Sequence, residues 1–182
     1  GPFDHDDYNG KYKMAWNEDG LYILLEIVDD TLLEQTEDPL KLWWNDDCVI
    51  VYVDEDNSGG QHRFNHNAFT YHVALDGNVV DLGVNEKPTL YNDHVISKHQ
   101  TEGNTTYWEM HVKVYPSIFN DKPTVKPVVL SEGKRIGFAI AYADNDNSKK
   151  RENLIGSVFV PGENKNAGWI DANVFGTLEL LK

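Results

Sequence analysis

The chain has 182 residues, of which 40% are hydrophobic and 12% aromatic, so it is long enough to enclose one hydrophobic core. Its formal net charge of -14 excludes a basic patch able to neutralise nucleic-acid phosphates and disfavours contact with anionic membranes. The longest apolar run, residues 21–28 with one interruption, is too short to span a bilayer, and a single cysteine, Cys48, excludes an internal disulfide.

Short segments of alternating polar and apolar residues follow one another almost throughout the chain, which is the pattern of β-strands. Turn residues separate these segments, and residues 17–20 and Asp76-Gly77-Asn78 each predict a hairpin. The expected strands are, in chain order, 11–16, 21–28, 48–53, 69–75, 79–82, 94–98, 106–115, 135–143, 154–160 and 174–181.

Helical periodicity is nearly absent. Only 34–42 and 116–120 are expected to form short helical turns, and 120–133, which contains two prolines, is expected to be a loop. Many short strands between Gly, Asn and Asp clusters favour an all-β fold, an antiparallel β-sandwich of jelly-roll or immunoglobulin-like type, with a barrel as the alternative. We expect one domain over residues 1–182, excised from a larger protein, because Gly1-Pro2-Phe3 is not a native start.

Two tryptophans lie in loops directly before strands. Trp44 is in the segment 42–47 and Trp169 is in the segment 164–171, and both segments are rich in Asn, Asp or Gly. A loop gives an indole no strand face on which to be buried, so the ring packs on a neighbouring loop or stays free for a flat ligand. The apolar face of a pyranose suits the second case, which predicts a sugar-binding domain.

The other three tryptophans are expected in the core. Trp16 and Trp108 lie on strand patterns, and Trp43 points away from its neighbour Trp44 if the backbone is extended. For Trp169, a clamp that seals the end of the sandwich is the competing interpretation.

In order and spacing, these segments are similar to carbohydrate-binding module family nine, a β-sandwich family within the wider DOMON-type group of haem and sugar binders. The resemblance runs through nearly the whole chain. It is carried by 21–30, Trp44-Asn45-Asp46-Asp47 with 51–54, Trp108-Glu109-Met110, 137–144 and 168–178. It implies a non-catalytic domain in which two tryptophans, here Trp44 and Trp169, sandwich a terminal sugar ring.

Polar groups at the ring edge would select the sugar. Asn166 stands three residues before the second tryptophan, as in the family, whereas the family's sugar-binding acid falls at Ile50 and its arginine falls near His72. The resemblance therefore implies stacking with a changed set of hydroxyl ligands, and it does not imply specificity for reducing-end glucose or cellobiose. We predict Asn166, Asn67 and His72 as edge ligands, with ordinary turn asparagines and an ordinary strand histidine as the alternatives.

Two acidic segments, 52–59 and 142–148, place oxygen ligands at alternate positions just past a strand, as calcium loops often do. Neither is an EF-hand, because the twelfth loop position lacks its glutamate. The first segment supplies our predicted metal ligands, Asp54 and Asp56, and the resemblance implies structural Ca²⁺. Solvated acidic turns are the alternative, and Asp4-His5-Asp6-Asp7 is a further candidate cluster.

Catalytic motifs are missing from the sequence, which lacks metalloprotease histidine spacing, a Gly-x-Ser-x-Gly motif and a phosphate loop. Cys48, in an apolar strand, is expected to be a buried small hydrophobe. We therefore expect a binding module and not an enzyme. A haem-binding role, with ligands such as Met110 and His72, is one alternative, and a protein-docking β-sandwich without sugar affinity is another.

The expected partner is an oligosaccharide or polysaccharide, with no nucleic acid and no membrane insertion. We expect a monomeric module fused to other domains of a polysaccharide-active bacterial protein, secreted or at the cell surface, in the extracellular space or the periplasm.

Overall fold

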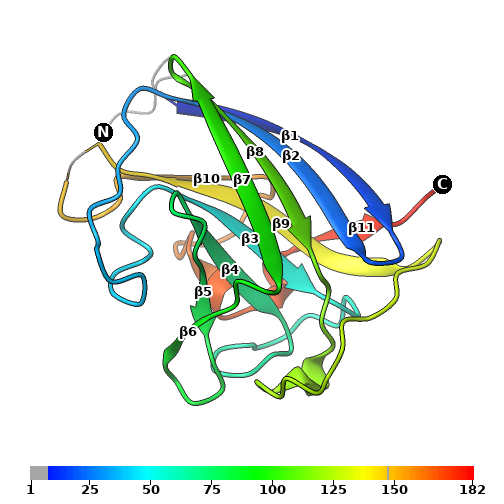
Figure 1. Cartoon of the computed structure of the whole chain (residues 1–182). Coiled ribbons are helices and arrows are strands. Elements are labelled where there is room, and N and C mark those ends of the chain that lie inside the picture. The colour runs from blue at the N-terminus through cyan, green and yellow to red at the C-terminus, as the bar shows by residue number, and fades with distance from the viewer. Residues whose placement is uncertain (1–7, 147) are drawn as a thin grey trace.

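Two antiparallel sheets packed face to face form the chain in the computed structural model, which describes residues 8–146 and 148–182 (Figure 1). The four-stranded sheet has the order β1 (Tyr8–Asn17), β2 (Gly20–Asp29), β8 (Thr105–Val112) and β7 (Val95–Glu102). The larger sheet has the order β10 (Asn153–Gly156), β9 (Arg135–Asp144), β3 (Cys48–Asp54), β4 (Phe69–Ala74), β5 (Val79–Leu82) and β6 (Pro88–Leu90), and β11 (Gly176–Glu179) pairs with β9. The predicted antiparallel β-sandwich is therefore confirmed, and the two separate sheets exclude the barrel.

The core lies between the sheets and follows the alternation of each strand. On β2 every second residue points inward, and the same holds for β8, where Trp108 and Met110 are buried at 0% and 3% exposure. The core position predicted for Trp108 is thus confirmed, and Met110 is packed among apolar side chains. Trp16 packs against the edge of this core, and its Nε1 donates a hydrogen bond to the Leu181 carbonyl at 2.9 Å.

The central strand β3 is buried on both faces, in contrast to the strands of the smaller sheet. Its inward side chains join the core, while Cys48 and Ile50 form a second apolar cluster with Ala141 and Ala143 on the outer face. Burial raises the pKa of the Cys48 thiol to about 12, so this cysteine is the inert, buried residue that the sequence predicted. The outer face of the larger sheet is therefore covered by connecting segments.

Helical structure in the described chain is limited to short 3-10 turns, η1 (Ser117–Phe119), η2 (Ala167–Trp169) and η3 (Ala172–Val174). No helix among these residues is long and apolar enough to cross a membrane. The turn expected over 116–120 is confirmed by η1, but the one expected over 34–42 is wrong. There, carboxylates of the following segment accept the backbone N–H groups: Asp46 accepts from Thr36 at 3.1 Å and Asp47 from Leu33 at 2.6 Å.

Strand ends differ from the expectation in two places that matter for function. The strand expected over 154–160 ends at Gly156, and the strand expected from 174 begins at Gly176. Residues that were expected in these two strands belong instead to the connection between β10 and β11, which is therefore longer than expected. This connection carries Trp169.

Candidate functional site

A cavity of about 630 Å³ lies on the outer face of the larger sheet. Its floor comes from outward-facing residues of neighbouring strands, Ile50 and Tyr52 on β3 and Thr70 and His72 on β4. The register pairs Ile50 with His72 and Tyr52 with Thr70, so alternation along the two strands brings these four side chains to one face. The volume is within the range of small-molecule sites in proteins.

Aromatic side chains from three connecting segments form the walls. They are Trp43, Trp44, Phe64 and Trp169. Trp44 is 40% exposed and Trp169 is 37% exposed, and both line this same cavity. The two tryptophans that the sequence predicted as a sugar platform are therefore brought together, and the indole of Trp169 is not sealed into the interior.

The Trp169 segment is anchored firmly to the sheet. The buried His62 contacts the Gly168 carbonyl through Nε2 at 2.8 Å, and the Thr70 hydroxyl donates to the same carbonyl at 3.4 Å. A Cβ on Gly168 would lie 2.9 Å from Cε1 of Tyr52, so only glycine permits this approach. The Arg63 guanidinium lies 5.0 Å from the Trp169 ring centroid, which gives the indole a cation neighbour.

The core position predicted for Trp43 is wrong. Its side chain is half-buried, lines the cavity and meets the Trp44 ring edge-on, with centroids 4.6 Å apart and planes at 83°. The reason is the backbone: Leu42 has a left-handed φ of 53°, and the Asn45 N–H donates to the Leu42 carbonyl at 2.8 Å. Opposite-pointing neighbours are a property of extended chain, and this segment is a turn.

Of the predicted polar ligands, Asn166 and His72 line the cavity. The Asn166 Oδ1 accepts a hydrogen bond from Nη2 of Arg151 at 2.7 Å. His72 donates from Nδ1 to the Thr70 carbonyl at 3.2 Å, and burial, with the nearby Arg151 charge, lowers its pKa to about 4. His72 is therefore a neutral hydrogen-bonding group at physiological pH.

Asn67, the third predicted polar ligand, does not line the cavity. Its Nδ2 donates to the Gly59 carbonyl at 2.6 Å, and its backbone N–H donates to Oδ1 of Asn65 at 2.9 Å. These bonds hold the segment after β3 in place. The turn-forming alternative therefore describes Asn67 better than a ligand role.

Charged groups that the sequence did not single out complete the lining, among them Arg63, Asp81, Glu86 and Arg151. Asp81 is held by two backbone donors, with Oδ2 accepting from Thr70 and Oδ1 from Leu82, each at 2.7 Å. Burial raises the pKa of Asp81 to about 7, so this carboxyl changes its charge near neutral pH. An acid within the short apolar strand 79–82 was the signal available in the sequence.

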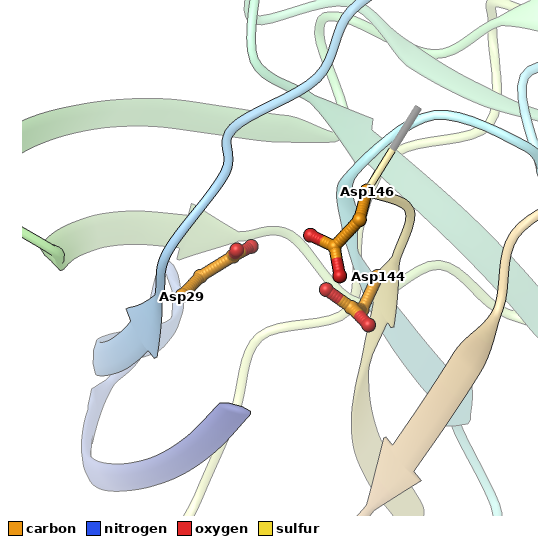
Figure 2. A group of neighbouring side chains, drawn as sticks. All are labelled: Asp29, Asp144 and Asp146. Atoms are coloured by element: carbon orange, nitrogen blue, oxygen red, sulfur yellow. The ribbon is translucent and has the colours of Figure 1, made fainter. Parts of the chain in front are cut away.

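A separate acidic triad lies where the ends of the two sheets come together. Asp29 ends β2, Asp144 ends β9 and Asp146 follows it, and each offers an oxygen within 4.8 Å of the others (Figure 2). Asp29 also accepts from the Tyr142 hydroxyl at 2.8 Å, and burial raises its pKa to about 6. Such a set of hard oxygen ligands could hold a divalent metal ion.

The predicted metal ligands Asp54 and Asp56 lie elsewhere, at the end of β3. Asp54 is buried, accepts from the Gly59 N–H at 2.7 Å and has its pKa raised by burial, whereas Asp56 is exposed and accepts from the Ser58 N–H at 3.1 Å. Within the described residues, no third Asp, Glu, His or Cys joins this pair at the spacing of the triad. The Asp4-His5-Asp6-Asp7 cluster lies outside the described residues.

Comparison with solved structures supports the fold. A family 9 carbohydrate-binding module from Caldicellulosiruptor kristjanssonii in complex with cellotriose aligns with a TM-score of 0.68 and 18% identity over 96% of this chain and 75% of that chain. Its complex with glucose aligns with a TM-score of 0.66 and 20% identity over 95% and 76%. A protein from Bacteroides uniformis ATCC 8492 aligns with a TM-score of 0.59 and 12% identity over 95% and 78%.

A search of curated protein sequences found no match. The family model described as "Carbohydrate family 9 binding domain-like" matches residues 2–182, almost the full length. That family consists of binding modules and not of enzymes, in agreement with the sequence. By this match, the chain belongs to the family 9 carbohydrate-binding domains, the family that its tryptophan-bearing loops resemble.

Proposed function

We propose that this carbohydrate-binding module holds a hexose of a β-1,4-glucan, as glucose or a cello-oligosaccharide, stacked against the indoles of Trp44 and Trp169. The observation that carries the proposal is that both indoles, from loops far apart in the chain, line one cavity with part of each ring exposed. The complexes of the similar modules with cellotriose and glucose support this choice of sugar.

The energetics of such a site are simple. An indole covered by a pyranose loses apolar surface to water at roughly 25 cal/mol per Å². Few atoms of a small ligand are buried, so the affinity should be modest, on the order of micromolar to millimolar. Polar groups around the ring then select among sugars, because each buried hydroxyl left without a partner costs about 1–3 kcal/mol.

Ile50 and His72 stand where the family has an acid and an arginine, and other residues of the cavity supply these two charges. Ile50 is 1% exposed and His72 is neutral, so neither supplies the acid or the cation that the resemblance leads one to expect. The cavity contains instead the carboxyl of Asp81 and the guanidinium of Arg151. We infer that these two groups form hydrogen bonds with the sugar hydroxyls and that Asn166 is oriented by its hydrogen bond to Arg151.

Calorimetric titration tests the proposal. Glucose, cellobiose and cellotriose should bind, and galactose, whose 4-hydroxyl points the other way, should bind more weakly. If none of the gluco-configured sugars binds, the proposal is wrong. A haem absorption band in the purified protein, or a protein partner whose binding alone changes tryptophan fluorescence, would favour the other two functions.

We also propose that the triad of Asp29, Asp144 and Asp146 holds structural Ca²⁺. Two of its carboxyls are buried, and like charges in a buried position repel one another unless a cation neutralises them. The oxygen donor set suits Ca²⁺ or Mg²⁺, and Ca²⁺ accepts the more flexible coordination geometry. The Asp54 and Asp56 pair remains a second candidate, because two carboxylates with backbone carbonyls and water also satisfy Ca²⁺.

We further propose that the module targets a polysaccharide-active protein to its glycan outside the cytoplasm of a bacterium. The strongly acidic, polar chain and its family membership support this role. A fluorescent reporter fused to the chain should be retained on insoluble glucan and released by soluble cello-oligosaccharide.

A further inference from the structure

A second hollow, of about 250 Å³, lies beside the proposed sugar cavity on the same face of the larger sheet. The two share Tyr52 and Asn166 as lining residues, so one wall of the sugar cavity is also a wall of this hollow. The hollow and the sugar cavity are therefore neighbours that meet at Tyr52 and Asn166.

Small side chains on the sheet create the depth of this hollow. Ala139 and Ala141 face outward from β9, and Gly156 lies opposite Ala141 in the β10–β9 register. The bulky rings of Tyr52 and Phe175 stand at the side, with centroids 5.3 Å apart. The result is an apolar floor between aromatic walls, which suits the C–H face of a sugar and offers little to a charged ligand.

Phe159 stands at the outer edge of the hollow and is 84% exposed, more than any other large hydrophobic side chain in the described chain. The Lys165 ammonium lies 4.7 Å from the ring centroid and donates to the Val160 carbonyl at 2.7 Å. This contact fixes the ring on one side and places a hydrogen-bond donor next to it. Single exposed apolar residues are ordinary on protein surfaces, so exposure alone does not indicate a binding role for Phe159. Its position beside the sugar cavity does.

We propose that this hollow is an outer subsite for a further hexose unit of the glucan held in the main cavity, with Phe159 as its platform and Lys165 as a hydroxyl donor. The inference rests on the proposed function and adds the length of the ligand: the main cavity takes the first two units, the hollow takes the third, and the module prefers oligosaccharides of three or more units. We infer a glucan chain as the occupant because the two hollows meet at Tyr52 and Asn166, so a chain held between the indoles would pass Asn166 to reach the second hollow.

A chain-length series tests the inference. Titration of the intact chain with glucose, cellobiose, cellotriose and cellotetraose should give affinities that rise about tenfold beyond cellobiose, since one covered aromatic face removes apolar area from water. Phe159→Ala should remove this gain and leave glucose and cellobiose affinity unchanged. Lys165→Met should reduce the gain in part.

Tyr107→Ala is the matched control, because Tyr107 is a 38% exposed aromatic on the other sheet, and it should keep the full gain. Affinities that do not rise with length, or a rise that survives Phe159→Ala, would overturn the outer subsite while short sugars still bind and the proposed function stands. Failure of every sugar to bind would overturn both. Phe159 is exposed, so the melting temperature of Phe159→Ala should equal that of the unaltered chain.

Discussion

The outer faces of the two sheets expose aromatic rings to a similar extent but differ in what surrounds them. Trp44 and Trp169 on the larger sheet are 40% and 37% exposed, and Tyr22 and Tyr107 on the smaller sheet are 40% and 38% exposed. The smaller sheet also has a hollow, of about 510 Å³, but none of the described residues lining it is a tryptophan. Exposure of an aromatic side chain alone therefore does not distinguish a binding face.

The connections between strands make the difference. On the smaller sheet, β1 and β2 are joined by a tight turn between Asn17 and Gly20, and Tyr22 lies flat against His111, with centroids 4.7 Å apart and planes at 12°. On the larger sheet, long segments before β3, after β3 and before β11 carry indoles and arginines over the strands. The strands supply a rigid floor, and the long connections supply the recognition groups.

The largest expected effect comes from removing an indole. Trp44→Ala and Trp169→Ala should each weaken glucan binding about a hundredfold, because each loses roughly 2–3 kcal/mol of apolar burial and the starting affinity is modest. Tyr22→Ala and Tyr107→Ala on the other sheet should bind as the unaltered chain does. Calorimetry and thermal melting of all four variants check this.

The same variants separate the two interpretations of Trp169. A ligand platform loses affinity with a nearly unchanged melting temperature. If Trp169→Ala instead lowers the melting temperature by many degrees, the side chain is a clamp, and the contrast between the two sheet faces disappears.

The next effect concerns the junction of the two sheets, where β2 and β9 end at the acidic triad. Ca²⁺ at a hundredfold excess over its dissociation constant should stabilise the fold by about 2.7 kcal/mol, or about 5–10 °C in melting temperature. Asp146→Asn should lose this response, and Asp56→Asn should keep it. The reverse pattern would assign the site to Asp54 and Asp56, and no response to Ca²⁺ or EDTA in any variant would remove structural calcium.

A smaller effect is the pH dependence of stability, which should arise from two buried carboxyls, Asp81 on β5 and Asp47 just before β3. Burial raises the pKa of Asp47 to about 8 and that of Asp81 to about 7, so the folded chain keeps protons that the unfolded chain has lost. Their contribution to stability is complete below about pH 4 and is lost progressively as the pH rises to the folded pKa values of about 7 and 8. Buried histidines with lowered pKa values, such as His72 and His94, act in the opposite direction, but only below about pH 6.5.

Melting temperatures measured in EDTA should therefore fall between pH 6.5 and 8.5. Asp81→Asn should remove the part of the fall that ends near pH 7. A melting temperature that rises over this interval would show that these carboxyls are charged and well solvated in the folded chain.

The smallest effect is expected for Asn67, which lies outside the cavity. Asn67→Ala should leave sugar affinity unchanged and lower the free energy of unfolding by about 1 kcal/mol, through loss of its bond to the Gly59 carbonyl. Denaturant unfolding and titration of one sample measure both quantities. A tenfold loss of affinity with unchanged stability would show that Asn67 is a sugar ligand after all.

Most of the fold could be predicted from the sequence because strand alternation and turn residues are local signals. Trp44 and Trp169 of the site could also be predicted, since an indole in a polar loop has no strand face to cover it, whereas Trp43 was wrongly expected in the core. Arg151 and Asp81 were not, because their place depends on the register of β3, β4 and β5 and on the path of a loop. The triad needs Asp29 from the other sheet, which the sequence alone does not bring next to segment 142–148, so the sequence favoured Asp54 and Asp56 of the first acidic segment.

The most direct test of the account is a crystal structure of the chain with cellotriose. One glucose ring should lie between the indoles of Trp44 and Trp169 and touch both, within reach of Arg151 and Asn166. Cellotriose bound over the smaller sheet, or bound in the cavity without contact to either indole, would contradict it.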